Sequence, residues 1–222
     1  MTPAANPSPP DLPEETSLAQ ALAALAPYGV RTGCRLIREG DETHLLPEEA
    51  RSIPARQPAM RRASGAARWI AHRLLADIGF DDVALPRAPS GAPAWPDGII
   101  GSLAHDDDMA VAAVATVATV GRILSLGIDV EPALPLPDDI FGIVVTAADR
   151  TGAADPRLAG RILFAAKEAV YKAAYPLDRE VLGYEDIAVD LDAGRATTKT
   201  GRGVSLAYCV APRVAVLAFV RE

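Results

Sequence analysis

The chain has 222 residues, of which 50% are hydrophobic and 23% charged, and its formal net charge at pH 7 is −7. This length allows one large domain or two small ones, with a substantial core. The negative charge argues against a general electrostatic grip on nucleic acid or on an acidic membrane. No apolar run reaches the roughly 18 residues that span a bilayer, so we expect neither nucleic acid nor membrane as a partner.

The N-terminal segment and the cysteines predict a cytoplasmic protein. Residues 1–13 are rich in proline and lack the basic start and apolar centre of a secretory signal, so we expect a flexible tail there. Cys34 and Cys209 lie far apart, without the spacing of metal ligands or the context of a nucleophile. Both are expected to be buried thiols.

Helical patterns dominate the first part of the chain. Residues 14–17 predict the start of a helix that ends near Pro27, and a strand is expected over 30–38. The acids after Pro47 lead into a short helix, and a longer amphipathic helix extends to Gly79. This longer helix carries a basic face that indicates either phosphate binding or simple solvation, formed by Arg61, Arg62, Arg68 and Arg73.

A loop rich in proline and glycine over 86–98 surrounds Trp95, for which we expect a platform role. Strands are predicted over 99–105 and 109–117, the second buried on both faces. His105 lies where they join, and a lone histidine is more often structural than a ligand. The three acids that follow it are interpreted as a solvated turn, because adjacent acids do not readily converge on one cation.

The second part of the chain begins with an apolar strand over 123–131. Asp129 and Glu131 alternate along it, so both carboxylates point to one face. A helix is expected from about 156 to 174, closed by Pro176. The remainder predicts a small antiparallel meander, with strands at 187–191, 196–199, 204–210 and 214–220.

Glu168 and Lys172 lie one turn apart on this helix and share a face. With the two acids of the strand they form a set of three carboxylates near Lys167 and Lys172. Hard oxygen ligands favour Mg²⁺ or Mn²⁺, and lysines neutralise phosphate charge that the metal does not reach. The alternative is an ordinary surface ion pair between Glu168 and Lys172, beside two acids that merely end a strand.

Two motifs carry a resemblance to a known family. G-I-D-V-E at 127–131 is followed by A-K-E-A-x-Y-K at 166–172, and this order and separation resemble the signature of the 4'-phosphopantetheinyl transferases. Upstream, W-P-x-G-x-x-G-S-x-x-H over 95–105 and the chain length resemble the long, single-chain branch that includes the enterobactin synthetase transferase component. The short, trimeric carrier-protein synthase branch fits less well.

The resemblance implies an α+β fold, a pseudo-dimer of two related α+β halves with the active site in the cleft between them. On this analogy residues 14–120 form an N-terminal half with coenzyme A contacts, and residues 121–222 form a C-terminal half with the metal and catalytic residues. No residue-level repeat in the sequence supports the duplication independently. A monomer is expected.

The implied reaction is magnesium-dependent transfer of 4'-phosphopantetheine from coenzyme A, a co-substrate, to a serine of an acyl, peptidyl or aryl carrier protein. Adenosine 3',5'-bisphosphate is left, and a role in siderophore or secondary-metabolite biosynthesis is expected. The implied ligands of Mg²⁺, or of Mn²⁺, are Asp129, Glu131 and Glu168. Glu168 is the implied base, and Lys172 neutralises phosphate charge. The other implied coenzyme contacts are Arg61, Arg62, Arg68, Arg87, Ser102, His105 and Lys167.

Several positions depart from the family pattern. Where the family typically has R-x-x-E-F-x-x-G-R, this chain has Met60, Ala63 and Ala67 but retains Arg68, and Ala104 replaces a common Ser or Thr. These departures leave a non-catalytic binder of coenzyme A or of a carrier domain as an alternative. An unrelated magnesium enzyme acting on nucleotides is a second alternative, which no glycine-rich phosphate loop supports.

Overall fold

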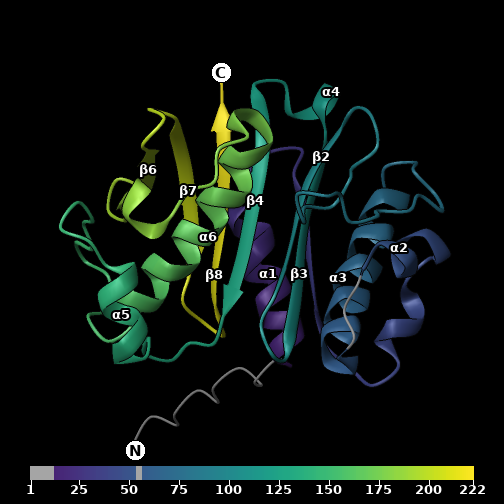
Figure 1. Ribbon diagram of the computed structural model, residues 1–222, viewed down its shortest axis with the longest axis horizontal. Helices are drawn as coiled ribbons and strands as arrows, with labels where there is room; N and C mark the ends of the chain where they lie inside the picture. Colours follow the sequence, from purple (N-terminus) through teal and green to yellow (C-terminus); the bar gives the residue numbers. More distant parts are fainter. Residues whose placement is uncertain (1–12, 54–56) are drawn as a thin grey trace, which may run out of the picture.

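Two antiparallel sheets and the helices that cover them form the molecule, so the expected α+β class is confirmed (Figure 1). The computed structural model describes residues 13–53 and 57–222. The tail expected at 1–13 therefore lies outside the described residues, except for Pro13. Within the described ranges, no helix combines the length and the apolar character that crossing a bilayer requires.

The first sheet has three strands in the order β1-β3-β2. The elements of this half are, in chain order, α1 (Glu14–Leu25), β1 (Arg31–Leu36), the 3-10 helix η1 (Asp41–His44), α2 (Pro47–Ser52), α3 (Pro58–Ala76), β2 (Ile99–His105), β3 (Met109–Thr116) and α4 (Val117–Val120). The predicted helices and strands of this half are confirmed, except that residue 117 begins the short helix α4 instead of ending β3.

Strand β3 is buried on both faces, as its apolar sequence predicts. Val111 and Ala113 pack with Leu18 of α1 in one hydrophobic cluster. Ala112, between them, packs with Ile70 of α3 in another. Because successive strand residues point to opposite faces, α1 and α3 cover the two sides of this sheet.

The second sheet has five strands in the order β4-β8-β7-β6-β5. The elements of this half are β4 (Ile123–Glu131), α5 (Asp138–Val144), α6 (Ala159–Asp178), the 3-10 helix η2 (Tyr184–Asp186), β5 (Ile187–Asp190), β6 (Arg195–Thr198), β7 (Gly203–Cys209) and β8 (Val214–Arg221). The predicted meander is confirmed. Its last strand also pairs with β4, which places the acid-bearing strand at the edge of this sheet.

One hydrophobic core is shared by the two sheets. It contains Leu22 of α1, Val111 of β3, Ile128 of β4 and Leu217 of β8, all fully buried. Figure 1 shows α6 in front of β4 and β8, with α1 behind them and β2 beside β4. At this junction the backbone N–H of Ile128 donates to Ser102 Oγ of β2 at 3.1 Å. The edges of the two sheets are therefore joined by both packing and a hydrogen bond.

Strand β4 crosses α6 at a glycine. A Cβ atom on Gly127 would lie 1.9 Å from the carbonyl oxygen of Ala169 and 2.8 Å from the backbone nitrogen of Ala173. Both helix residues are small and fully buried. The two backbones can therefore approach closely, and the contact fixes β4 against α6 two residues before the first acid of the strand.

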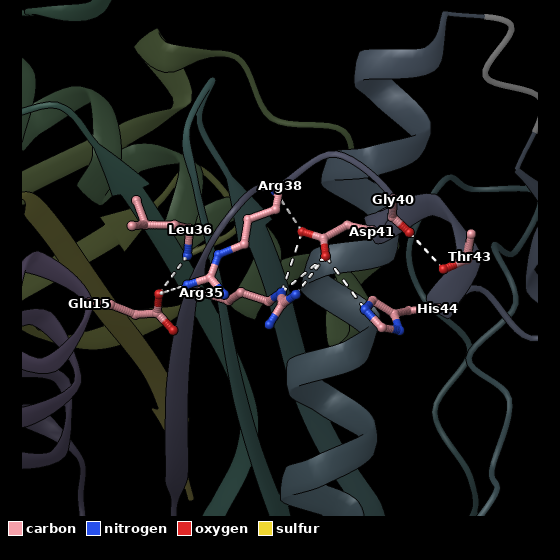
Figure 2. Close-up of polar contacts among 8 residues, drawn as sticks. All are labelled: Glu15, Arg35, Leu36, Arg38, Gly40, Asp41, Thr43 and His44. Carbon is pink, nitrogen blue, oxygen red and sulfur yellow. Dashed lines mark hydrogen bonds and ion pairs between the residues drawn. The ribbon is translucent and has the colours of Figure 1, made fainter.

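A buried carboxylate anchors the connection between β1 and α2. Asp41 is 1% exposed and accepts hydrogen bonds from the Arg35 guanidinium and from the backbone N–H of Arg38, both at 2.8 Å. His44 Nε2 lies 3.5 Å from the same carboxylate, and Arg38 also reaches Glu15 of α1 (Figure 2). Burial opposes ionisation, but these hydrogen bonds outweigh it and lower the pKa of Asp41.

Helix α6 differs from its predicted boundaries, because it ends at Asp178 and contains Pro176 in its last turn. Proline has no backbone N–H, so Pro176 cannot donate the helical hydrogen bond to the carbonyl of Lys172, and the helix ends two residues later. The chain leaves the helix at Arg179, which has a φ of 56°. The additional turn brings Pro176 and Arg179 to the cleft described below.

Gly127→Ala is expected to lower the free energy of unfolding by about 2–3 kcal/mol, because the added methyl group would overlap backbone atoms of α6. The control is Gly203→Ala in β7, where nothing lies within 4 Å of the Cβ position. The control should change stability by less than about 0.5 kcal/mol. Urea denaturation measures both, and a Gly127→Ala variant as stable as the control would contradict the close contact.

Candidate active site

Asp129 is the more buried acid of the predicted metal pair. It is 5% exposed, and its Oδ1 accepts a hydrogen bond from Lys172 Nζ at 2.6 Å. Its Oδ2 is buried and has no hydrogen-bond partner among the described residues. Burial raises the pKa of Asp129 to about 6, against the opposing effect of Lys172. A buried carboxylate oxygen without a partner is costly unless a cation or donor completes it.

Glu131 ends β4 and has a different cationic partner. Arg161 Nη1 of α6 donates to Glu131 Oε2 at 2.7 Å. The same guanidinium donates to the carbonyl oxygens of Leu134 and Pro135, each at 3.1 Å. Burial, reinforced by the charge of Asp129, raises the pKa of Glu131 to about 7. Arg161 thus holds the chain that follows β4 and compensates part of the acidic charge.

Glu168 of α6 pairs with a tyrosine. The Tyr184 hydroxyl of η2 donates to Glu168 Oε1 at 2.9 Å, and burial, together with the Glu168 charge, raises the pKa of Tyr184. Lys172 turns instead to Asp129 and to the carbonyl oxygen of Ile128, which lies 3.2 Å from its Nζ. In the described part of the chain no ion pair joins Glu168 to Lys172. The alternative of an ordinary surface ion pair is therefore wrong.

The three predicted metal ligands influence one another but do not converge on one point. The Asp129 charge contributes to the raised pKa of Glu131, and the Glu168 charge contributes to that of Asp129. Over residues 13–53 and 57–222, no three acidic, histidine or cysteine side chains are close enough to hold a metal ion together. The donor chemistry still fits a hard divalent cation, which would relieve the mutual repulsion and complete Asp129 Oδ2.

A cleft of about 630 Å³ extends from Glu168 and Lys172. These two residues belong to its α6 wall, and the facing wall comes from β2 and the loop before it, with Trp95 and Ser102. A Cβ atom on Gly101 would lie 2.6 Å from the Trp95 ring, so the ring packs directly on the backbone of β2. The cleft therefore has walls from both halves of the molecule.

The predicted coenzyme contacts on and near β2 differ in their relation to this cleft. Ser102 lines it, but the residue is 4% exposed and its hydroxyl accepts the N–H of Ile128. His105 ends β2, and burial lowers the pKa of its half-buried ring. Arg87 is exposed, and its Nε donates to the carbonyl oxygen of the cleft residue Gly91 at 3.3 Å. His105 and Arg87 stay predicted contacts.

The predicted arginine contacts on α3 do not line the cleft. Arg68 is 6% exposed, and its Nε donates to the carbonyl oxygen of Leu85 at 2.9 Å. Burial lowers the pKa of Arg68. Arg61 donates to the carbonyl oxygen of Ala50 at 3.4 Å, and Arg62 is half-buried. Arg68 thus holds the chain before the cleft loop, and a coenzyme contact by Arg61 or Arg62 stays a prediction.

Lys167 requires a correction, because its ammonium lies inside the protein. Its side chain is 0% exposed, and Nζ donates to Asp149 Oδ2 at 2.7 Å, to Val144 O at 2.8 Å and to Tyr184 O at 3.0 Å. Successive helix residues differ in direction by about 100°, so Lys167 points inward while Glu168 reaches the cleft. With all three N–H groups bonded to protein, Lys167 has none left for coenzyme A.

The acids that follow β2 also differ from the predicted solvated turn. Asp106 accepts the backbone N–H groups of Asp108 and Met109 at 2.8 and 2.7 Å and pairs with Arg213. Arg213 also pairs with Glu14 of α1 at 2.6 Å. Of the three acids, only Asp107 and Asp108 are exposed. Asp106 therefore links the end of β2 to the start of β8, because a carboxylate can satisfy several donors at once.

Sequence reasoning missed Arg161, Tyr184 and Asp149. Arg161 precedes Glu168 by seven residues, two helix turns, so the shared face was readable from the sequence. Tyr184 and Asp149 come from separate segments, and their distance along the chain gives no local signal. Only the folded structure shows that Asp149 pairs with Lys167 and that Tyr184 pairs with Glu168.

Two family models match the chain, the 4'-phosphopantetheinyl transferase N-terminal domain over residues 48–115 and the 4'-phosphopantetheinyl transferase superfamily over residues 125–217. The chain belongs to the 4'-phosphopantetheinyl transferase superfamily, and it is an enzyme of that type. The expected fold of two related α+β halves agrees with these matches. The boundary after residue 120 and the enterobactin-like branch stay predictions.

Curated relatives carry the same designation. The chain is 33% identical over 185 residues to 4'-phosphopantetheinyl transferase Npt of Nocardia iowensis, covering 82% of each chain. It is 40% identical over 172 residues to PptT of Mycobacterium tuberculosis, covering 72% of this chain and 70% of the relative. It is 38% identical over 163 residues to Svp of Streptomyces mobaraensis, covering 70% of this chain but only 65% of the relative.

Lys167→Met is expected to lower the free energy of unfolding by about 3–5 kcal/mol, because Asp149 would remain buried without a cation. The double variant Lys167→Met with Asp149→Leu removes both charges and should recover part of this loss. Guanidinium denaturation measures both variants. A loss below about 1 kcal/mol for the single variant would contradict a fully buried ion pair.

The raised pKa values of Asp129 and Glu131 predict a pH-dependent stability. The ordinary values are 3.8 and 4.5, and the folded values are about 6 and about 7. Between about pH 4 and 7 the folded state therefore binds more protons than the unfolded state, so the contribution of these groups lowers stability as pH rises.

Asp129→Asn combined with Glu131→Gln should remove this loss. In chelator-treated protein the double variant is expected to gain on the order of 2 kcal/mol over the unsubstituted protein near pH 8, and much less near pH 4. Urea denaturation at the two pH values gives the comparison. Equal differences at both pH values would show that the two carboxyls do not titrate as stated.

Proposed function

We propose that the enzyme transfers 4'-phosphopantetheine from coenzyme A to a serine of an acyl, peptidyl or aryl carrier protein. The observation that carries this proposal is the position of Asp129, Glu168 and Lys172 beside a cleft with walls from both halves. Membership of the transferase superfamily gives the arrangement its reaction class. The products are the holo carrier protein and adenosine 3',5'-bisphosphate.

Asp129, Glu131 and Glu168 are the proposed ligands of Mg²⁺, with Mn²⁺ as an alternative. When bound, the cation would neutralise pyrophosphate oxygens of coenzyme A. The unpartnered Oδ2 of Asp129 supports the assignment. Since Arg161 occupies Oε2 of Glu131, that residue has one oxygen left for the cation unless the arginine moves.

The proposed reaction forms one phosphorus–oxygen bond and breaks another. The serine oxygen attacks the phosphorus that carries the pantetheine arm, and the bond from that phosphorus to the bridging oxygen breaks. Glu168 accepts the serine proton, directly or through water. Lys172, held at the acidic edge by Asp129 and by the carbonyl of Ile128, neutralises charge on the departing phosphate.

The remainder of the cleft suits the rest of coenzyme A. Its apolar and aromatic lining, with Trp95 on one wall and Tyr171 and Tyr175 on the other, matches an extended chain of methylene and amide groups. Arg87 is our proposed contact for a more distant phosphate, because its guanidinium lies at the cleft loop and makes a single hydrogen bond within the described residues.

Transfer is tested by incubating the protein with coenzyme A, Mg²⁺ and a panel of apo carrier domains, including domains from siderophore and other secondary-metabolite synthases, and then measuring intact masses. We expect at least one carrier to gain one phosphopantetheine, and EDTA to abolish the gain. Coenzyme binding without a mass increase on any carrier would favour the non-catalytic binder instead.

Lys172→Ala should lower kcat by about 100-fold or more with a smaller change in coenzyme A affinity, because its charge acts mainly on the departing phosphate. Arg195→Ala, an exposed cation on β6 outside the cleft, serves as the control and should transfer at the unsubstituted rate. Steady-state transfer and calorimetric coenzyme binding separate the two effects. A pure affinity defect would assign Lys172 to binding alone.

A further inference from the structure

The buried Lys167 connects three separate segments around the base of the site. Its Nζ bonds to the carbonyl oxygen of Val144 at the end of α5, to Asp149 in the following loop and to the carbonyl oxygen of Tyr184 in η2. Asp149 in turn accepts the backbone N–H of Val189 on β5 through its other oxygen, at 3.0 Å. The buried side chain of Lys167 thereby fixes η2 against α6.

Tyr184 is the member of this network that reaches the active site. Its carbonyl oxygen accepts from Lys167, while its hydroxyl donates to Glu168 Oε1 at 2.9 Å. Its ring packs against Phe164, with ring centroids 5.8 Å apart. Lys167 thus holds the backbone of Tyr184, and Phe164 packs against its ring. These two contacts restrict the movement of the hydroxyl away from Glu168.

We propose that Tyr184 is a positioning residue for Glu168, and that Lys167 acts on the site by holding Tyr184. This inference rests on the proposed role of Glu168 as metal ligand and base. A glutamate side chain on a helix has several rotamers, and a donor fixed on Oε1 selects among them. The other carboxylate oxygen then remains for the cation or for the serine proton.

The arrangement explains the adjacency of Lys167 and Glu168 in the sequence. The two side chains leave α6 in different directions, yet both end on Tyr184, one on its carbonyl oxygen and one on its hydroxyl. Lys167 does not face the cleft, and in this proposal it influences Glu168 only through Tyr184. Its proposed contribution is geometric, because it neither touches the substrate nor transfers a proton in the reaction.

The test is Tyr184→Phe, which removes the hydroxyl and keeps the ring. The matched control is Tyr208→Phe, because Tyr208 packs against the same core cluster and its hydroxyl makes no hydrogen bond within the described residues. Mn²⁺ alone is the probe, and its affinity is measured by electron paramagnetic resonance without coenzyme or carrier. Transfer kinetics and thermal midpoints are measured on the same samples.

Tyr184→Phe is expected to weaken Mn²⁺ binding and to lower kcat by about 3-fold to 10-fold, the range that loss of one hydrogen bond produces. Its KM for the carrier and its thermal midpoint should stay close to those of Tyr208→Phe. Unchanged Mn²⁺ affinity in Tyr184→Phe would overturn the proposal. A fall in activity that only parallels a fall in thermal midpoint would also overturn it, since that result indicates general destabilisation.

The part played by Lys167 is tested by adding Lys167→Met to Tyr184→Phe. If Lys167 acts through Tyr184, each single variant weakens Mn²⁺ binding and the double variant is little worse than Tyr184→Phe. Independent, multiplicative losses would overturn this link. Where Lys167→Met does not fold, Asp149→Asn replaces it, because that change keeps the buried lysine and loosens only one of its three contacts.

Failure of the transferase assignment gives a different result. A protein that binds Mn²⁺, loses affinity on Tyr184→Phe and modifies no carrier would retain the positioning role and refute the transfer reaction. A protein that modifies a carrier at the same rate with and without the Tyr184 hydroxyl would retain the reaction and refute the positioning role. An unsubstituted protein that does not bind Mn²⁺ would refute the positioning role as well, because Glu168 would then have no cation to hold.

Discussion

The site depends on the close approach of β4 and α6 at Gly127. Because the carbonyl of Ala169 occupies the space where any side chain at residue 127 would lie, the strand and the helix meet backbone to backbone. Beside this contact lie Asp129 on the strand and Glu168 on the helix, two residues of the proposed metal site. The lack of a side chain at Gly127 therefore allows the strand and the helix to bring Asp129 and Glu168 close together.

Charge compensation around the acids follows from their burial. Asp129, Glu131 and Glu168 each find a separate donor, respectively an ammonium, a guanidinium and a phenol. The pKa values of the first two are nevertheless raised, because burial and mutual repulsion outweigh the cations nearby. The protein alone therefore neutralises this region incompletely, which is the condition under which a divalent cation gains most from binding.

The sequence predicts the framework of this site better than its contacts. Strand β4 and its two acids were predictable because alternation and terminal prolines determine them locally, and the motif spacing brought Glu168 and Lys172 into the same group. Lys167 shows the limit, since helical direction alone puts it on a different face from Glu168 but does not show which face is buried. The partners of Asp129 and Glu168 depend on side-chain geometry across segments that lie far apart in the chain.

The core that α1 shares with both sheets has a consequence for how substrates enter. Leu22, Val111 and Leu217 pack in the same cluster, so swinging one half away from the other would expose apolar surface from three elements at once. Such a hinge is energetically unfavourable. We therefore expect substrates to enter without separation of the two halves, along the part of the cleft lined by the loop around Trp95 and the last turn of α6.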